Sequence, residues 1–237
     1  MPLPLNLAMT PLEIAQNPFT GVPLAWMSCH FSEEGQGLTD LPEELPEHAL
    51  LILDDRIPCC GHSAPMAAAI LQELITQFHC SGLLLDFQRT ANTQTTAMVE
   101  MLVHTLPCPV AVTPEYSGNL HCPVFLPPPP LHIPMEQYLD PWRGREVWLE
   151  AALCQERISV TKNGTVFEPL FTAVPSDGFF HERLQCRYAI RTTADTITFT
   201  LYDTPETLKE KLISARSLGV SRAVGLYQEL GTYFAEK

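Results

Sequence analysis

The chain has 237 residues, 46% of them hydrophobic, which is enough for one large core or two modest ones. Its net charge of −13 argues against nucleic acid or an anionic membrane as a partner, because both would repel an acidic surface. No apolar run approaches the roughly 18 residues of a membrane-spanning helix. The N-terminal residues 1–6 also lack the basic region of a signal peptide, so we expect a soluble cytoplasmic protein.

The eight cysteines predict free thiols. Several fall inside expected strands or helices, as Cys29 and Cys80 do, where reduced thiols behave as small buried hydrophobic groups. In a chain without an export signal, free thiols fit better than a disulfide framework. The motif Cys59-Cys60-Gly61-His62 resembles a metal-binding cluster. However, adjacent cysteines seldom bind one zinc together, and the sequence has no second CxxC or HxH pair. We expect no metal and no cofactor.

Eight apolar stretches predict β-strands, and segments with helical periodicity separate most of them. In chain order these strands are Leu5–Met9, Gly21–Ser28, Ala49–Asp55, Gly82–Phe87, Pro109–Tyr116, Pro123–Pro127, Glu146–Ala152 and Arg222–Leu230. The clearest helices begin at Ser63, at Thr95 and at Thr204, and the last of these carries proline and an acidic residue in its first turn.

The pattern changes after the seventh strand. Residues 157–171 alternate about Asn163-Gly164, the strongest short hairpin signal, and residues 187–202 alternate again. This predicts an antiparallel insert, residues 155–202, within a single domain of residues 1–237. Eight strands with helices between most of them predict an α/β fold, a trimmed (β/α)8 TIM barrel. The alternative, an open doubly wound sheet, lacks its glycine-rich phosphate-binding turn.

The fourth strand ends abruptly in polar groups, which is how a parallel strand delivers side chains to a site. Carboxylates lie near several predicted strand ends: Asp54, Asp55, Asp86, Glu115, Glu150 and Glu229. Each could instead cap a helix or pair with Arg56, Arg89 or Arg145. Four aromatic residues could stack on sugars, although aromatics at strand ends more often serve packing; these are Trp26, Tyr116, Trp148 and Tyr227.

Two stretches of the chain resemble glycoside hydrolase family 18, which includes chitinases and spore peptidoglycan hydrolases. The family's fourth strand carries DxxDxDxE, and Gly82–Gln88 (GLLLDFQ) matches its glycine, its last aspartate as Asp86, and its aromatic as Phe87. Residues 201–208 resemble the family's YDDPESI sequence before the last helix, and residues 223–230 its final strand. The family also has a small insert after the seventh strand.

The resemblance places the family's catalytic glutamate on Gln88, its middle aspartate on Leu84 and its first aspartate on Ser81. An amide has no proton to transfer at ordinary pH, and losing a positioned general acid costs on the order of 10²–10⁴ in rate. The predicted sixth strand also runs into Pro127–Pro130, with no match to the family's tyrosine–aspartate pair there.

We therefore predict a catalytically impaired barrel that binds an N-acetylated glycan, or a similar small ligand, at the C-terminal ends of its strands. The candidate catalytic residues are Asp86, Glu115 and Glu150. The candidate ligand-binding residues are Gln88, Asp54, Asp55, Trp26, Tyr116, Trp148, Tyr227 and Glu229.

Two alternatives remain open. One is an active glycoside hydrolase with a rearranged carboxylate pair, Asp86 with Glu115 or Glu150, which would need a suitable separation across the sugar. The other is a non-enzymatic interaction protein whose barrel mouth is closed by packed side chains.

Overall fold

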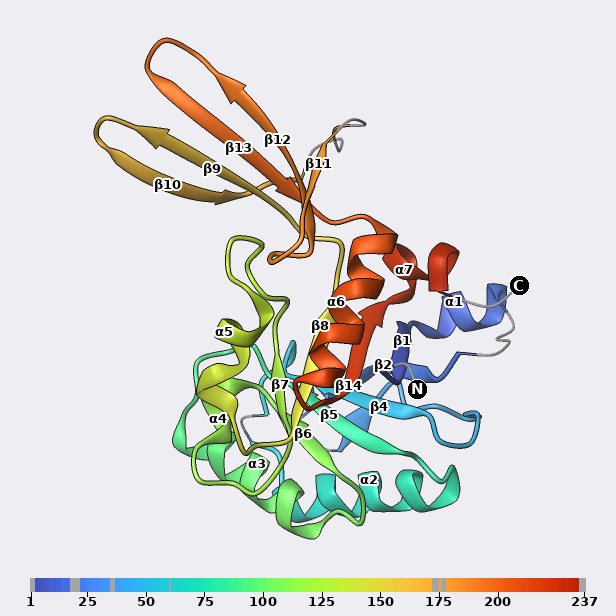
Figure 1. Ribbon diagram of the computed structural model, residues 1–237. Coiled ribbons are helices and arrows are strands. Elements are labelled where there is room, and N and C mark those ends of the chain that lie inside the picture. The colour runs from blue at the N-terminus through green and yellow to red at the C-terminus, as the bar shows by residue number, and fades with distance from the viewer. Residues whose placement is uncertain are drawn as a thin grey trace.

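The computed structural model describes residues 3–17, 22–34, 37–59, 61–171, 175 and 178–234 (Figure 1). Its main sheet contains eight parallel strands: β1 (Leu5–Met9), β2 (Leu24–Phe31), β4 (Leu50–Asp54), β5 (Gly82–Asp86), β6 (Val110–Val112), β7 (Val124–Leu126), β8 (Val147–Ala151) and β14 (Val220–Leu226). Each strand pairs with the next, and β1 pairs with both β14 and β2, which closes the sheet into a barrel. The predicted TIM-barrel fold is confirmed.

The apolar strands are buried on both faces, as in other parallel sheets. In β5, Leu83 and Leu85 pack outward against the helix layer, whereas Leu84 points into the barrel. The barrel interior is filled by Ala8, Ala25, Leu50, Ile52, Leu84, Ala111, Phe125, Trp148 and Val224. Since side chains two apart share a face, the residue after Leu84 on the interior face is Asp86.

Three long helices cover the outside of the barrel: α2 (Ala64–Gln77), α3 (Thr93–Thr105) and α6 (Pro205–Ser217). Side chains of Ser63, Asn92 and Thr204 cap their first turns. The other connections are short helices or loops, as expected for a trimmed barrel: α1 (Pro11–Gln16), α4 (Pro114–Ser117), α5 (Met135–Leu139) and the 3₁₀ turn η1 (Asp140–Trp142). The helix α7 (Tyr227–Phe234) follows the last barrel strand. None of the described helices is both long and apolar enough to cross a membrane.

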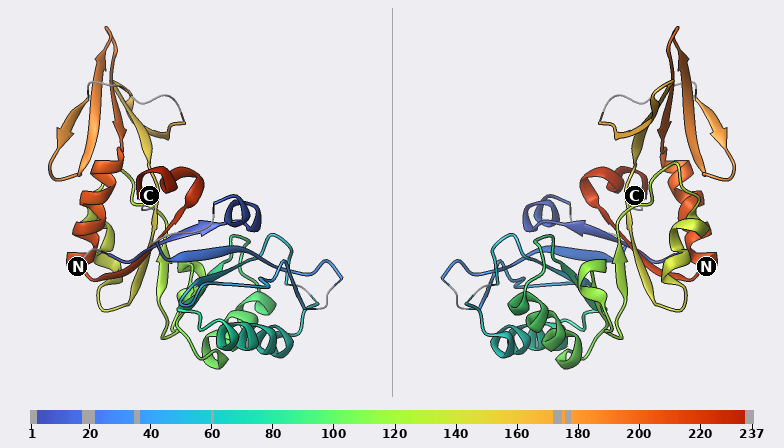
Figure 2. Two further views of the ribbon diagram at one scale, coloured as in Figure 1. Left: turned by 90° about the vertical axis from the view of Figure 1, so that its right-hand side faces the viewer. Right: turned by 90° about the vertical axis from the view of Figure 1, so that its left-hand side faces the viewer.

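A second sheet follows β8, the seventh barrel strand, and projects away from the barrel (Figures 1 and 2). Its antiparallel order is β10-β9-β13-β12-β11, and the chain then returns through α6. The strands are β9 (Gln155–Thr161), β10 (Gly164–Pro169), β11 (Phe179–His181), β12 (Cys186–Thr192) and β13 (Thr196–Tyr202). The hairpin predicted at Asn163-Gly164 joins β9 to β10.

Three predicted strand ends are wrong by three or four residues. The fifth strand stops at Val112 rather than Tyr116, because Thr113-Pro114 begins the short helix α4, with proline in its first turn. The eighth stops at Leu226 rather than Leu230, because residues 227–234 form α7. The second strand continues to Phe31 rather than ending at Ser28, and its predicted start at Gly21 lies outside the described residues. The short strand β3 (Leu38–Thr39) pairs antiparallel with the C-terminal end of β2.

Candidate functional site

The mouth of the barrel contains a cavity of about 160 Å³ at the C-terminal ends of the strands. Its polar lining consists of Asp54, Asp86, Gln88 and Glu150, and Ile52, Leu84 and Phe125 contribute apolar walls. Asp54 and Asp86 are register partners on the neighbouring strands β4 and β5, and Glu150 comes from β8. This is the end of the barrel on which TIM-barrel enzymes place their active sites. The structure thus brings four of the predicted site residues together.

Asp86 and Gln88 are joined by a hydrogen bond. The Gln88 side-chain amide donates to Asp86 Oδ1 over 2.5 Å, and the Gln88 side chain is exposed at the rim. Burial raises the pKa of Asp86; the bond from Gln88 partly offsets this, and the charges of Asp54 and Asp55 add to it. The amide therefore favours the ionised form of Asp86, whereas the surrounding acids oppose it.

Glu150 completes an acidic group in the cavity. Burial raises the pKa of its carboxyl, and the negative charges of Asp86 and then Glu229 raise it further. No lysine or arginine is among the described residues that line the cavity. Carboxylates accept hydrogen bonds, so the mouth is suited to an uncharged ligand rich in O–H and N–H donors rather than to an anion.

His30 on β2 orients Asp54 and is a residue that sequence reasoning missed. Its Nδ1 lies 2.9 Å from Asp54 Oδ1, and the ring is buried. The Arg56 guanidinium, which can only donate, faces Nε2, so we assign the proton to Nδ1, where Asp54 accepts it. The backbone N–H of Arg56 donates to the same Asp54 oxygen over 3.0 Å. A histidine inside an apolar strand was the available signal, but the predicted strand stopped two residues short of it.

Asp55 lies outside the cavity and holds the loop that carries Gln88. Its two carboxylate oxygens accept the backbone N–H groups of Gln88 and Arg89, over 2.9 and 3.0 Å, and the side chain is buried. The Tyr116 hydroxyl donates to the Arg89 carbonyl of the same loop over 3.1 Å. Asp55, predicted to contact ligand, instead holds the backbone of Gln88 and Arg89, and Tyr116, also predicted to contact ligand, holds the backbone of Arg89.

The other two predicted acids are also outside the cavity. Glu115 is exposed on α4 and accepts the backbone N–H of Ala91 over 2.9 Å. The predicted pairing of Asp86 with Glu115 is therefore not formed in this cavity, and the pairing with Glu150 is the one the fold brings together. Glu229 lies on α7, where its carboxylate accepts the backbone N–H of Leu153.

None of the four predicted aromatic platforms is among the cavity-lining residues. Trp26 packs in the core and donates from Nε1 to the Asp40 carbonyl over 3.1 Å. Trp148 is buried in the barrel interior, beneath the Arg222 guanidinium at 4.5 Å from its ring centre. Tyr227 directly follows β14 and begins α7, and it does not line the cavity. Among the described residues, the aromatic side chain that lines the cavity is Phe125.

The motif considered for a metal can be described only in part. Cys60 lies outside the described residues, and Cys59 is buried. His62 uses Nε2 to contact the Ser32 carbonyl at 3.0 Å.

The closed barrel and its insert have the fold of family 18 chitinases and spore cortex-lytic enzymes. The SleL enzyme of Bacillus cereus aligns with a TM-score of 0.56 and 12% identity over 94% of this chain and 70% of its own. A GH18 chitinase of Cycas revoluta solved with (GlcNAc)3 aligns with a TM-score of 0.56 and 12% identity, over 93% of this chain and 94% of the chitinase. The chitinase of Chromobacterium violaceum aligns with a TM-score of 0.52 and 9% identity, over 94% of this chain and 93% of its own.

No family model matches the sequence, and no curated protein matches it. The structural matches have low sequence identity, so they establish the fold. The resemblance drawn from the two sequence motifs is confirmed at that level.

Replacing Glu150 by Gln should stabilise the protein at neutral pH. The folded protein raises the pKa of this carboxyl above its ordinary value of 4.5, so ionising it costs folding free energy once the pH exceeds that value. The amide removes this cost. Calorimetry should give a higher Tm for Glu150→Gln than for wild type at about pH 7. At about pH 3.5 there should be no difference, because the Glu150 carboxyl is then protonated in both the folded and the unfolded protein.

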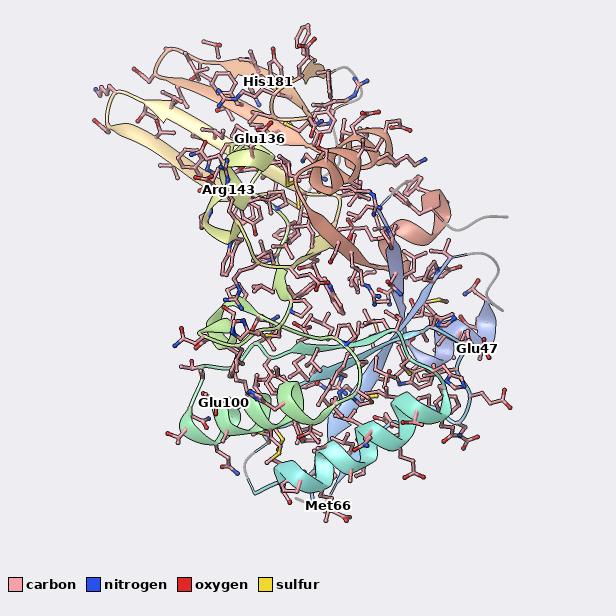
Figure 3. The ribbon with its side chains drawn as sticks, turned by 60° about the horizontal axis from the view of Figure 1, so that its bottom comes forward. Glu47, Met66, Glu100, Glu136, Arg143 and His181 are labelled. Atoms are coloured by element: carbon pink, nitrogen blue, oxygen red, sulfur yellow. The ribbon has the colours of Figure 1, made fainter. Side chains whose placement is uncertain are left out.

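The matched control is Glu136→Gln on α5, an exposed glutamate labelled in Figure 3. It should leave Tm unchanged at both pH values. A lower Tm for Glu150→Gln at neutral pH would show that Glu150 is ionised and favourably bonded, which contradicts this account of the cavity.

Proposed function

We propose that the barrel mouth binds an N-acetylated glycan, or a similar small ligand, and does not hydrolyse it efficiently. The observation that carries the proposal is the Asp86–Gln88 pair in the cavity, with an amide in the position that the family motif gives to its acid. A glutamine side chain can position a substrate by hydrogen bonds but cannot protonate a leaving group.

The ligand class is supported by the relatives of this fold. One Cycas revoluta chitinase structure contains (GlcNAc)3, and a double mutant of that chitinase, with one glutamate changed to glutamine, contains (GlcNAc)4. A chain of this fold with such a change can therefore hold a chitin oligosaccharide. The donor-poor cavity here would accept hydrogen bonds from sugar hydroxyls and from an acetamido N–H.

The size of the cavity limits how much of a glycan it holds. Pockets for drug-sized ligands are typically about 300–1,000 Å³, whereas this cavity is about 160 Å³. It suits one sugar residue or its acetamido group, with the rest of an oligosaccharide lying across the rim. Phe125 and Met27 would contact the methyl group or the apolar face of the sugar.

Calorimetric titration with tri-N-acetylchitotriose tests this proposal. We expect binding by the wild type and a loss of about 10–100-fold in affinity for Asp86→Ala, since hydrogen bonds to charged groups contribute roughly 1.5–3 kcal/mol each. Glu115→Gln is the control, an acid outside the cavity whose amide oxygen can still accept from Ala91. Absence of heat at millimolar ligand, or an equal loss in the control, would contradict the proposal.

Converting Gln88 to Glu should give a stable protein with at most weak glycosidase activity. The two side chains are nearly isosteric and this one is exposed, so little packing is lost. The new carboxylate removes the amide donor from Asp86 and raises the pKa of that group further by like-charge repulsion. Turnover stays low because β7 is still followed by Pro127–Pro130 in place of the family's sixth-strand pair.

Hydrolysis of a chromogenic chitobioside by Gln88→Glu, beside Gln88→Ala, measures this effect. Rates of about 1 s⁻¹ or more for the Glu variant alone, within the normal range of enzymes, would mean that the acid was the only missing part.

A second candidate is an active hydrolase that uses Asp86 with Glu150. Both line one cavity, and Glu150 has the raised pKa expected of a general acid. This candidate predicts wild-type turnover that Glu150→Gln abolishes. The remaining alternative, a mouth closed by packed side chains, is disfavoured by the cavity itself.

We also propose the cytoplasm as the compartment. The support is that Cys29, Cys80 and Cys154 are free thiols in the structure, as in proteins of a reducing compartment. Burial raises the pKa of Cys29 to about 12, which keeps its thiol protonated and unreactive. Paired cysteines in protein isolated from its native source would contradict this assignment.

A further inference from the structure

The five-stranded insert has one largely apolar face and one largely polar face, although Val166 and Phe180 lie on the polar one. Register partners across the sheet project on the same side, and the row Phe167, Ile158, Phe199 and Ile190 crosses four strands. Phe179 on β11 and Ile197 on β13 lie on this same side. The next row, on the opposite side, is largely polar and consists of Val166, Ser159, Thr198 and Arg191.

The barrel covers only the near end of this apolar face. Leu131, in the loop after β7, packs against Cys186 and Leu201, and the His132 ring lies 4.4 Å from the Phe167 ring. Outside this contact, Phe179 on the edge strand β11 is 66% exposed, and Ile190 and Ile197, farther along their strands, are 51% and 42% exposed. A hollow of about 440 Å³ opens on this face between His132, His181 and Phe199. Figure 3 labels His181 on the outlying sheet.

The charge of the chain is divided unequally between insert and barrel. Residues 155–202 contain five basic and five acidic side chains and are neutral. The rest of the chain has nine basic and 22 acidic side chains, and so carries the whole net charge of −13. Two copies would repel each other through their barrels. They would not do so through the inserts, which point away from the barrels (Figures 1 and 2).

We propose that the apolar face of the insert docks against the same face of a second copy of this chain. Contiguous apolar surface of this kind marks an interaction site, and two sheets stack face to face about 10 Å apart. The same patch on both copies gives a two-fold symmetric interface. This arrangement buries the exposed side chains while keeping the acidic barrels apart.

The size of the face predicts a weak dimer. The longest strands of the insert have seven residues and are about 24 Å long, and five strands at about 4.8 Å spacing span about 20 Å. The face therefore covers at most roughly 500 Å², part of which the barrel already covers. A standard stable interface buries about 800 Å² on each partner. Association should therefore depend on concentration over the micromolar range.

Sedimentation velocity of the whole chain at concentrations from about 1 to about 200 µM tests the proposal. The mass should rise from the 26.4 kDa monomer toward twice that value. Added salt should increase the dimer fraction by screening the repulsion between barrels. Ile190→Lys should raise the concentration at which half of the protein is dimeric at least tenfold. It should do so even though it reduces the net charge from −13 to −12, which by itself would weaken the repulsion between copies.

Val166→Lys is the matched control, because Val166 is 53% exposed on the opposite face of the same sheet. It should leave the midpoint unchanged. If the circular dichroism of the Ile190→Lys variant shows that it is not folded, Phe179→Lys replaces it. Phe179 lies on the edge strand β11 of the same apolar face, and its replacement should weaken the dimer in the same way. A monomer at all concentrations, or an equal loss of dimer in the Val166 control, would overturn the proposal.

Discussion

Replacing Lys211 by Met should destabilise the protein by about 3–5 kcal/mol, the usual effect of leaving one partner of a buried ion pair uncompensated. Lys211 Nζ lies 2.7 Å from Asp203 Oδ1, and the two side chains are only 7% and 2% exposed. The Thr207 hydroxyl donates to the same oxygen over 3.1 Å. For a chain of this size the loss corresponds to a fall in Tm of roughly 6–20 °C, which calorimetry would measure.

The pH dependence separates this mechanism from lost packing. Burial raises the pKa of Asp203 above its ordinary value of 3.8, and the positive charge of Lys211 opposes that rise. Without Lys211 the pKa of Asp203 in the folded protein rises further. The loss of stability relative to wild type should therefore grow as the pH rises through the already raised Asp203 pKa of the folded wild type, and it should shrink at lower pH. Lys209→Met, an exposed lysine on the same helix, should change Tm little. A deficit independent of pH would assign the effect to packing.

Replacing Asp55 by Ala should destabilise the protein by about 3 kcal/mol and also weaken ligand binding. The buried carboxylate accepts two backbone N–H groups, from Gln88 and Arg89, and each hydrogen bond to a charged group contributes roughly 1.5–3 kcal/mol. Releasing that loop moves Gln88 away from Asp86. Urea unfolding would give the loss of stability, and glycan titration well below the new unfolding midpoint would give the loss of affinity.

The control for this change is Asp140→Ala. Asp140 forms an exposed ion pair with Arg143, 2.7 Å apart, and such pairs contribute only about 0–1 kcal/mol. Asp55→Ala with full stability but reduced affinity would mean that Asp55 contacts the ligand directly, contrary to its position in the structure.

The barrel could be predicted because its signal is repeated. Apolar runs such as Leu83–Leu85 are long enough to be buried on both faces, and each is followed by a capped helix or a turn. The strand ends were less predictable, because apolar residues continue across the boundary. Tyr116 and Leu230 are both buried, but from helices α4 and α7 rather than from strands.

The acids of the mouth could be predicted from the alternation of side chains along a strand. Asp86 and Glu150 each follow an interior residue by two positions, after Leu84 and Trp148. The aromatics could not, because proximity to a strand end does not give the face: Trp26 packs outside the barrel and Trp148 inside it, below the mouth. The role of His30 could not be predicted without the register of β2 with β4, which pairs His30 with Asp54.

The most direct test of the central claim combines binding and cleavage in one sample. Wild-type protein is titrated with tetra-N-acetylchitotetraose in a calorimeter, and the same mixture is then analysed by mass spectrometry for shorter oligosaccharides. The Asp86–Gln88 pair predicts heat of binding with the oligosaccharide recovered intact. Efficient cleavage to di- or trisaccharides would show that the mouth retains a working acid and would contradict the account.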